Sequence, residues 1–573
     1  CMKKKWVLKK SYPPSLAKKF PDEDEVGRQM FFERGLKTAE AGNKFFNPDY
    51  ERDLHDPFQH KDMEKAAQRI IRAVKEGEKM VIFGDYDADG MCGVAVFSDF
   101  LKKIGFVNFE THIPDRYQEG YGLSQKAVEK FMELKPALVV TIDCGVTNLQ
   151  EIEKLHSHNI EVIVIDHHLP PPKLPEAYAI IDAKREDDDY PYEYLCGAGA
   201  AFKVIQAILK IDSFGLPPGW EKWLLDLVGI AIIADMVPLT GENRALVYYG
   251  LRVAQKTRRP GLLALYRKLN LNPSLITEED IAFSVAPYIN AASRMGCETT
   301  SFDLLVTSSL TEAEWLVEKI CQTKEEQRRL VDKIINGVKN KYGDLDNLPP
   351  VIATGDFSWN QGVLGLSANR LLEFFSRPIF LWGKGGVSAD IKGSARSADL
   401  NVVEIMRALP EDFFIDFGGH HFAGGFTVSS EKIAEFEKKI NEVVSEKSRD
   451  KTRFLKIEAD KELDIEEVDG RLFEKIRRFA PFGAGNPAPI FWFKNLELKH
   501  IVAMGNNGYH LKLFFHKPNG EELTAILWHK GLRPELQNLT VGSKLEFLAA
   551  IELSRYNGRK ELRLAVKDYK INK

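Results

Sequence analysis

Short, nearly uninterrupted hydrophobic runs recur through the first 245 residues, and acidic residues follow them directly. Val81–Phe83, Val139–Ile142 and Val162–Ile165 are the clearest cases. Such a run, without polar alternation, is typical of a strand buried on both faces of a parallel sheet. In open α/β sheets, ligands bind beyond the carboxyl ends of the strands. The pattern therefore predicts an α/β domain that brings several carboxylates to one edge of its sheet.

The pattern changes along the chain, and 573 residues are too many for one hydrophobic core. A polar N-terminal extension is followed by alternating strands and helices, a helical connector, a second α/β unit and short strands with Gly/Asn turns. The last zone suggests a small barrel of the OB type, so the predicted fold class is α/β multidomain. Within the connector, helical spacing predicts one long helix from Thr311 to about Ile335. The predicted boundaries are 1–50, 51–245, 246–345, 346–450 and 451–573.

The overall composition, 44% hydrophobic and 28% charged, is that of an ordinary globular protein. No apolar stretch reaches about 18 residues, so no membrane span is expected. The N-terminus is charged without a following apolar core, so no signal peptide is expected. Six cysteines without a Cys-x-x-Cys pair disfavour a disulfide framework or a zinc site. A reducing, cytoplasmic location is therefore expected.

The net charge of −4 hides an uneven distribution. Residues 471–573 hold 18 Lys and Arg against 9 Asp and Glu, a net of +9, which leaves −13 on the remainder. Aromatic residues lie between these basic ones, an arrangement that suits single-stranded nucleic acid, although most of the aromatics are expected in the core. The residues concerned are Phe491–Phe493, Tyr509, Trp528 and Tyr556, with Lys512, Lys530, Arg555, Arg559 and Lys560.

Acidic residues and histidines follow the hydrophobic runs. They are Asp85, Asp87 and Asp89, then Asp143, then Asp166-His167-His168, and Asp235 after the run Ile230–Ala234. Carboxylates this close repel one another unless cations bind them. Oxygen ligands with one or two imidazoles suit Mg²⁺ or Mn²⁺, so a two-metal hydrolytic site is expected.

Simpler interpretations exist for the individual residues. Asp143 or Asp235 taken alone is explained equally well as a helix N-cap. An EF-hand is excluded, because the twelfth position counted from Asp85 is Val96 and a buried strand precedes the motif. The glycines of residues 418–425 are explained equally well by anion binding or by tight packing.

At this point the chain resembles a known family. The order of Asp85–Gly90, Ile142-Asp143, Asp166–His168 and Ala234-Asp235 is similar to the DHH phosphoesterase superfamily, and residues 418–425 resemble the glycine-rich signature of the associated DHHA1 domain. Three further segments, 287–296, 393–397 and 481–487, resemble the RecJ branch, the single-strand-specific 5′→3′ DNA exonucleases. The resemblance covers roughly residues 50 to 573. Ser293 and Asn360 depart from it, standing where Gly and His are usual.

The resemblance implies roles for particular residues. Asp89, Asp143, His167 and Asp235 would form one metal position, and Asp87 with Asp143, completed by Asp85, would form the other. His168 would either support one of these metal ligands or contact a phosphate, and Tyr121 would stack on a base. A 5′-phosphate pocket would use Arg116, Arg294, Ser394 and Arg396, with His420 of the glycine-rich segment also on the substrate.

The expected function is metal-dependent hydrolysis of single-stranded DNA from the 5′ end to 5′-mononucleotides, in repair and recombination. Expected partners are single-stranded DNA, a single-strand binding protein and a helicase, and the protein is expected to be a monomer. One alternative is a phosphodiesterase of short oligonucleotides or cyclic dinucleotides, which the C-terminal zone disfavours. The other is a non-catalytic single-strand-binding scaffold, which the retained carboxylates disfavour.

Overall fold

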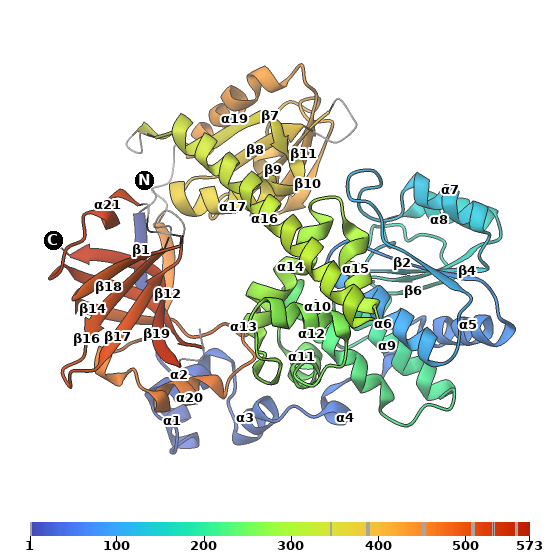
Figure 1. The fold of residues 1–573 in the computed structure, drawn as a ribbon, viewed down its shortest axis with the longest axis horizontal. Coiled ribbons are helices and arrows are strands. Elements are labelled where there is room, and N and C mark those ends of the chain that lie inside the picture. Colours follow the sequence, from blue (N-terminus) through green and yellow to red (C-terminus); the bar gives the residue numbers. More distant parts are fainter. Residues whose placement is uncertain are drawn as a thin grey trace.

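The computed structural model describes residues 3–572, apart from 344–346, 385–389, 449–453, 506–509, 530, 532 and 556–559. Two α/β units and a β-barrel make up the molecule, and one long helix, α16 (Leu310–Lys341), runs from the first α/β unit to the second (Figure 1). No described helix is both long enough and apolar enough to cross a membrane.

The first α/β unit is built on a five-stranded, fully parallel sheet in the order β3-β2-β4-β5-β6. Alternate residues of its central strands join two separate hydrophobic cores, so the sheet is buried on both faces, as its apolar runs predict. Helices α5, α6 and α9 cover one face, and α7 and α8 cover the other. The elements are β2 Met80–Gly84, β3 Phe109–His112, β4 Leu138–Ile142, β5 Glu161–Ile165, β6 Ala179–Ile181, α5 Met63–Glu76, α6 Ala88–Lys103, α7 Gln125–Leu134, α8 Leu149–Ser157 and α9 Gly197–Ile211.

A group of helices joins this unit to the second. The apolar run before Asp235 ends helix α10 (Leu225–Ala234), which is buried along most of its length and so has no polar face to reveal a helical period. The predicted long helix is confirmed as α16, which begins at Leu310 and extends to Lys341. The remaining helices are α11 Gly241–Ala254, α12 Pro260–Lys268, α13 Glu278–Asp280, α14 Ala286–Ser293 and α15 Glu298–Val306.

The second α/β unit has a mixed five-stranded sheet in the order β10-β11-β9-β8-β7. Strands β7 and β8 are parallel and the other pairs are antiparallel. One core packs it against α18 and α19, and another packs it against α17 and the end of α16. The elements are β7 Ile352–Asn360, β8 Ile379–Lys384, β9 Ile391–Arg396, β10 Asp416–His420, β11 Ala423–Val428, α17 Gln361–Phe375, α18 Val402–Arg407 and α19 Ile433–Ser448.

The C-terminal zone forms a seven-stranded sheet in the order β13-β14-β18-β19-β17-β16-β15. This confirms the predicted OB-like barrel, with more strands than the sequence suggested. The elements are β13 Lys461–Glu462, β14 Phe491–Glu497, β15 His500–Met504, β16 His510–His516, β17 Glu522–Leu527, β18 Lys544–Ser554, β19 Glu561–Asn572, α20 Gly470–Arg477 and α21 Pro534–Gln537.

The N-terminal extension, to which the sequence assigned no role, packs on this barrel. Strand β1 (Lys3–Leu8) pairs in parallel with β12 (Phe454–Ala459). Apolar side chains of α1 (Pro14–Lys19) and α2 (Glu25–Glu33) enter the barrel core, and those of α3 (Ala39–Phe46) pack against it. The next helix, α4 (Tyr50–Asp53), packs on the core of the first α/β unit through Tyr50. The extension and the barrel therefore form one unit, which we call the C-terminal body.

Candidate metal centre

The carboxyl ends of the parallel strands place the predicted acidic residues together. Asp85 follows β2, and Asp87 caps α6 by accepting hydrogen bonds from the backbone of Asp89 and Gly90. Asp143 follows β4 in the left-handed backbone region, with φ of 64°. A left-handed non-glycine residue is strained and is frequent at functional sites.

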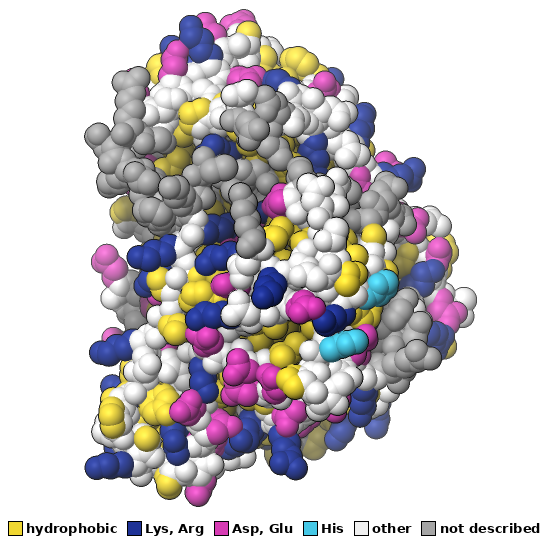
Figure 2. Space-filling model, turned by 90° about the vertical axis from the view of Figure 1, so that its left-hand side faces the viewer, with side chains coloured by type: hydrophobic (Ala, Val, Ile, Leu, Met, Phe, Trp, Pro, Cys, Tyr) yellow, Lys and Arg dark blue, Asp and Glu magenta, His cyan; other side chains and the backbone are white. Residues whose placement is uncertain are grey.

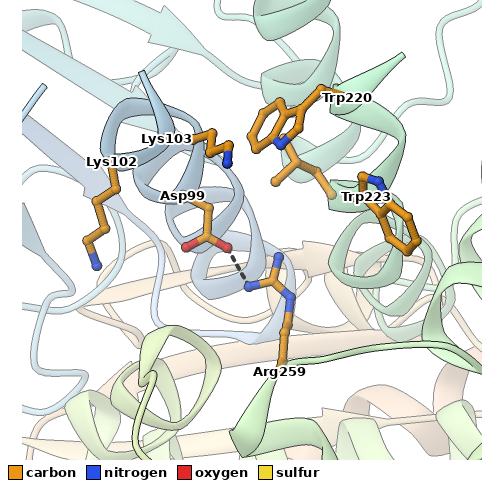
Figure 3. A pocket seen from close by; sticks show the side chains of 7 residues that line it. Asp99, Lys102, Lys103, Trp220, Trp223 and Arg259 are labelled. Atoms are coloured by element: carbon orange, nitrogen blue, oxygen red, sulfur yellow. Dashed lines mark hydrogen bonds and ion pairs between the residues drawn. The ribbon is translucent and has the colours of Figure 1, made fainter. Parts of the chain in front are cut away.

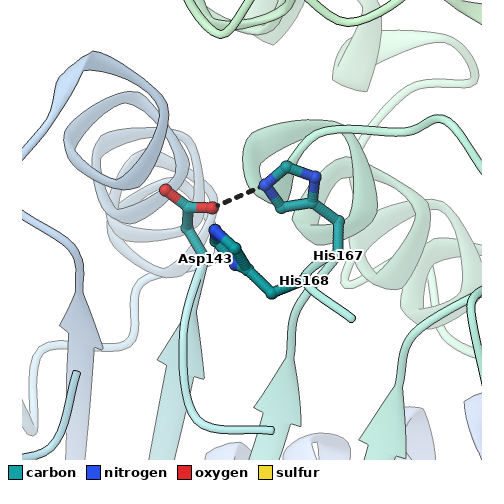
Figure 4. A group of neighbouring side chains, drawn as sticks. All are labelled: Asp143, His167 and His168. Atoms are coloured by element: carbon teal, nitrogen blue, oxygen red, sulfur yellow. Dashed lines mark ion pairs between the residues drawn. The ribbon is translucent and has the colours of Figure 1, made fainter. Parts of the chain in front are cut away.

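One imidazole nitrogen lies among three of these carboxylates. His167 Nε2 is 3.0 Å from Asp143 Oδ1 and 3.8 Å from an oxygen of both Asp89 and Asp235. Figure 4 shows the imidazoles of His167 and His168 close to the Asp143 carboxylate, with the ion pair drawn between Asp143 and His167. Residues from three strand ends and from the end of α10 therefore meet in one place.

The donor atoms fall into overlapping groups that have the spacing of metal ligands. Asp85, Asp87 and Asp143 form one group, Asp89, His167 and Asp235 form another, and within each group the donor atoms lie within 4.8 Å of one another. His168 joins Asp143 and His167 in a third. Among the described residues, Asp85 Oδ1 is buried without a hydrogen-bond partner. Carboxylate oxygens and an imidazole fit Mn²⁺ or Mg²⁺.

Burial and mutual repulsion oppose negative charge at this centre. Burial, followed by repulsion from Asp89 and Asp87, raises the pKa of Asp143 well above its ordinary value. The same causes raise the pKa of Asp235 to about 8. Burial lowers the pKa of His167 to about 4, so its imidazole is neutral at pH 7 and has a lone pair to offer. Bound cations would reverse the cost of ionising the carboxylates.

The first residues of α9 hold two of the carboxylates in position. Asp89 accepts hydrogen bonds from the backbone nitrogens of Gly197 and Ala198, at 2.6 and 2.8 Å, at the start of α9. Gly197 has no space for a side chain, because a Cβ there would lie 2.8 Å from Asp143 Cα. No local sequence pattern links Gly197 to Asp143, and sequence reasoning missed this contact.

Two further side chains organise the centre without belonging to the predicted set. Asp166 accepts hydrogen bonds from the Val146 nitrogen at 3.0 Å and from His168 Nδ1 at 2.8 Å, which explains why it is not among the ligand groups. Asn290 Oδ1 accepts a hydrogen bond from the Ala88 nitrogen at 2.9 Å and so ties α14 to the start of α6. The segment 287–296 contains Asn290, but a motif alone does not show which backbone group its side chain reaches.

The four residues predicted for a phosphate pocket lie close together across the two α/β units. Arg396 Nη1 donates to Ser394 Oγ at 2.9 Å. Burial, and then the charges of Arg116 and Arg396, lower the pKa of Arg294. The Arg116 guanidinium stacks over the Tyr86 ring at 4.8 Å. This concentration of positive charge is favourable for an anion.

The start of α17 lies against two of these arginines, Arg294 and Arg396. Asn360 caps the helix by accepting from the Gly362 nitrogen at 2.8 Å, and Gly362 leaves no room for a Cβ beside the Arg294 carbonyl. A Cβ on Gly365 would be 2.9 Å from Arg396 Nη2. A helix N-terminus adds partial positive charge and backbone N–H donors for an anion.

The other predicted substrate residues differ in their distance from the centre. Tyr121 lies beside it, with its hydroxyl 3.0 Å from His168 Nδ1, and its side chain is 45% exposed. His420 is exposed at the end of β10, and no described contact ties it to the carboxylates. Their roles stay predictions.

On the barrel, Trp528 is the described aromatic that best matches the expected pattern. It is 42% exposed, with the His510 ring 5.0 Å away and the Arg563 guanidinium 5.6 Å from its ring centre. Phe491 and Phe493 are instead fully buried in the barrel core. Tyr509, Lys530, Tyr556 and Arg559 lie outside the described residues.

The barrel side of the molecule has no single-sign surface. Figure 2 shows Lys and Arg side chains recurring along one edge of this face and acidic side chains gathered lower down. The positive net charge of residues 471–573 is therefore interspersed with acidic groups on the face in view.

An open hollow lies at the far end of α6 (Figure 3). Its base is an ion pair between Asp99 and Arg259, and Arg259 also bonds Asp226 at 2.9 Å. Because α6 has 16 residues, the hollow is roughly 24 Å along the helix from Asp87. It is separate from the metal centre. The remaining lining residues are Lys102, Lys103, Trp220, Trp223 and Leu224.

Comparison with protein families gives three matches along the chain. The DHH family N-terminal domain matches residues 79–232, the DHHA1 domain matches 348–446 and the RecJ OB domain matches 459–568. These matches agree with the resemblance inferred from the motifs.

Individual relatives are similar over most of the chain. The single-stranded-DNA-specific exonuclease RecJ of Bacillus subtilis is 32% identical, over 94% of this chain and 67% of the relative. That of Haemophilus influenzae is 31% identical, over 90% and 91%. The crystal structure of RecJ from Thermus thermophilus in complex with Mn²⁺ has a TM-score of 0.80 at 26% identity, covering 99% of this chain and 80% of that one.

Proposed function

The chain belongs to the RecJ family, and on that premise we propose that it is a two-metal exonuclease acting on single-stranded DNA. It degrades the strand from the 5′ end to 5′-mononucleotides, in DNA repair and recombination. The observation that carries the proposal is the pair of adjacent donor groups, Asp85-Asp87-Asp143 and Asp89-His167-Asp235. The relatives' names and the Mn²⁺ in the Thermus thermophilus structure support it.

Two divalent cations, Mn²⁺ or Mg²⁺, would supply the charge that activates a water molecule and stabilises the leaving oxygen. Asp89, His167 and Asp235 would hold one of them, and Asp85, Asp87 and Asp143 would hold the other. Asp143 also lies beside His167 and would contribute to both positions. The neutral His167 adds a nitrogen ligand without adding charge.

His168 has a different task from His167. Burial lowers its pKa, but the hydrogen bond and charge of Asp166 outweigh that and raise it overall. Asp166 thereby fixes the ring next to Asp143, where its other nitrogen can donate to a phosphate oxygen of the substrate. The hydroxyl of Tyr121 supports the same ring, and its half-exposed face is available to a base.

The arginine cluster gives the enzyme its end preference. Arg294 and Arg396 lie against the start of α17, Arg116 lies close enough to Arg294 to lower its pKa, and a terminal 5′-phosphate is the anion that fits them. Ser394 adds a hydroxyl donor. A phosphate held there places the first phosphodiester bond at a fixed distance from the carboxylates, which accounts for both the polarity and the mononucleotide product.

The barrel holds the strand that has not yet been cut. Exposed Trp528 beside Arg563 offers a stacking surface and a positive charge, which bind single strands with little sequence preference. The proposal also includes action as a monomer in the cytoplasm, together with a single-strand binding protein and a helicase. These finer points rest on the family resemblance and on cysteine usage.

The deciding experiment uses 5′-labelled and 3′-labelled single-stranded oligonucleotides with Mn²⁺ or with EDTA. The wild type should release 5′-mononucleotide early and only with metal, and Asp143→Asn should release none. Asp189→Asn, which changes an exposed carboxylate, should behave as the wild type. Tight binding without cleavage would instead indicate the scaffold function, and cleavage confined to dinucleotides or cyclic dinucleotides would indicate the small-substrate phosphodiesterase.

A further inference from the structure

The turn formed by Pro481–Pro487 lies directly against the loop that follows Asp235. The backbone nitrogen of Leu239 donates to the Ala484 carbonyl at 2.7 Å. Leu239 itself is 2% exposed. The C-terminal body therefore contacts the chain four residues after a proposed metal ligand.

The glycines of the turn bring the two segments close together. A Cβ on Gly483 would be 2.7 Å from Leu239 Cδ1. A Cβ on Gly485, whose φ is +70°, would be 3.0 Å from Pro238 Cβ and 3.2 Å from Thr240 Cγ2. Both positions pack glycine against residues 238–240, which explains why this turn is built from small residues.

The turn keeps its shape through its own buried polar contacts. Asn486, 1% exposed, donates from Nδ2 to the carbonyls of Phe479 at 2.8 Å and Pro481 at 2.7 Å, and its Oδ1 accepts from Arg34 Nε at 2.6 Å. Arg244 of α11 donates to the Ala480 carbonyl at 2.8 Å. These buried hydrogen bonds hold the turn in one conformation.

The loop after Asp235 is held on its other side as well. The Tyr192 hydroxyl lies 2.8 Å from the Thr240 carbonyl, and Asn243 Nδ2 donates to the Pro238 carbonyl at 3.1 Å. Met236 has φ of +59°, so the chain reverses immediately after Asp235. Pro238 is therefore fixed from both sides. Only the few backbone angles between residues 235 and 238 separate this fixed point from the Asp235 carboxylate, so the position of Pro238 determines where that carboxylate lies.

We propose that the Pro481–Pro487 turn is a positioning element for Asp235, so that the C-terminal body sets the affinity of the Asp89-His167-Asp235 group for its cation. The inference rests on the proposed function of that group. It predicts that disturbing the turn weakens metal binding before it weakens DNA binding. The barrel would then have two roles, holding DNA and completing the metal centre.

The test compares Gly485→Ala with Gly520→Ala. Both glycines lie in the C-terminal body in left-handed turns, with φ of +70° and +85°, but a Cβ on Gly520 meets nothing within 4 Å. The two variants therefore share the backbone cost of an alanine in that region, and they differ in the contact with Pro238. The measurements are the Mn²⁺ concentration that gives half-maximal nuclease activity, Mn²⁺ affinity by calorimetry, and oligonucleotide affinity in EDTA.

Groups behind metal ligands typically change metal affinity by about 10- to 100-fold when altered, and a contact one step further removed should give about 3- to 10-fold. Gly485→Ala should raise the half-saturating Mn²⁺ by that factor, recover activity in excess Mn²⁺ and bind DNA in EDTA as the wild type does. Gly520→Ala should leave all three values unchanged. Equal Mn²⁺ dependence in both variants, at wild-type DNA affinity, would overturn the proposal. Mn²⁺-independent or absent activity in the wild type would instead refute the proposed function itself.

Discussion

A single methyl group at Gly197 should damage catalysis while the protein stays folded. Gly197 begins α9, and its Cβ would lie 2.8 Å from Asp143 Cα and 2.9 Å from Asp143 Cγ. The shortest contact of that Cβ is with Asp143 Cβ, closer still than these two atoms, and the optimal separation of two carbon atoms is about 3.5 Å or more. One segment must therefore move by about 1 Å. Asp143 is the ligand that both proposed cation positions share, and the movement disturbs both.

The size of the effect follows from that displacement. Overpacking a buried site costs about 1–3 kcal/mol of stability, against which alanine in a helix recovers roughly 0.5–1 kcal/mol. Misplacing a catalytic group by about 1 Å can lower the rate by about 100-fold. Gly197→Ala should therefore lose about two orders of magnitude in kcat and unfold at only slightly lower urea concentration.

Gly199→Ala is the matched control, two residues further along the same helix. Its Cβ would make an ordinary contact, 3.5 Å from Leu195 Cδ2. It should keep the wild-type kcat and gain a little stability. The assay is steady-state release of mononucleotide at saturating Mn²⁺, with urea unfolding alongside. A wild-type kcat for Gly197→Ala would refute the reasoning, because it would show that the metal centre tolerates the movement.

Three further predictions concern the same region. Because the pKa of Asp235 is raised to about 8, a proton bound at pH 7 must leave before a cation binds, and Mn²⁺ affinity should rise with pH from 6 to 8. Calorimetry in buffers of different ionisation enthalpy should show this proton release. Binding heats that do not depend on the buffer would contradict the prediction. Asn290→Ala leaves the Ala88 N–H unpaired and should lower the free energy of unfolding by about 1–3 kcal/mol in urea; an unchanged midpoint would count against this link. Arg396→Ala should reduce the preference for a 5′-phosphorylated over a 5′-hydroxyl oligonucleotide. The control Lys438→Ala, on helix α19, should show the wild-type preference. An equal preference in both variants would show that Arg396 does not bind the 5′-phosphate.

Much of the fold could be predicted from the sequence because the strands of the first unit are buried on both faces. Their unbroken apolar runs, each followed by Asp, define both the strand and its carboxyl end. The run before Asp235 was ambiguous, since a helix buried all round has the same appearance as a strand. Asp235 nevertheless reaches the cluster from the end of α10.

The supporting contacts could not be predicted because they join residues far apart in the chain. Gly197 lies under Asp143, and Asn290 caps the start of α6 from across about 200 residues. Both depend on how helices pack onto the sheet, which no local pattern records. The extension was missed for the same reason, because its apolar residues are too sparse to indicate a core of their own.

The pairing of β1 with β12 has a consequence for how the protein is made. Strand β1 pairs with a strand that is synthesised about 450 residues later, and Trp6 also donates to Asp568 at 2.8 Å. At about 5–20 residues per second, β1 waits roughly 20 to 90 seconds for β12. During that interval Leu16, Phe20 and Phe31 have no barrel core to enter. Both α/β units can fold as they emerge, whereas the C-terminal body closes only after β19 has been made. Until then the apolar side chains of α1 and α2 stay open to misassociation.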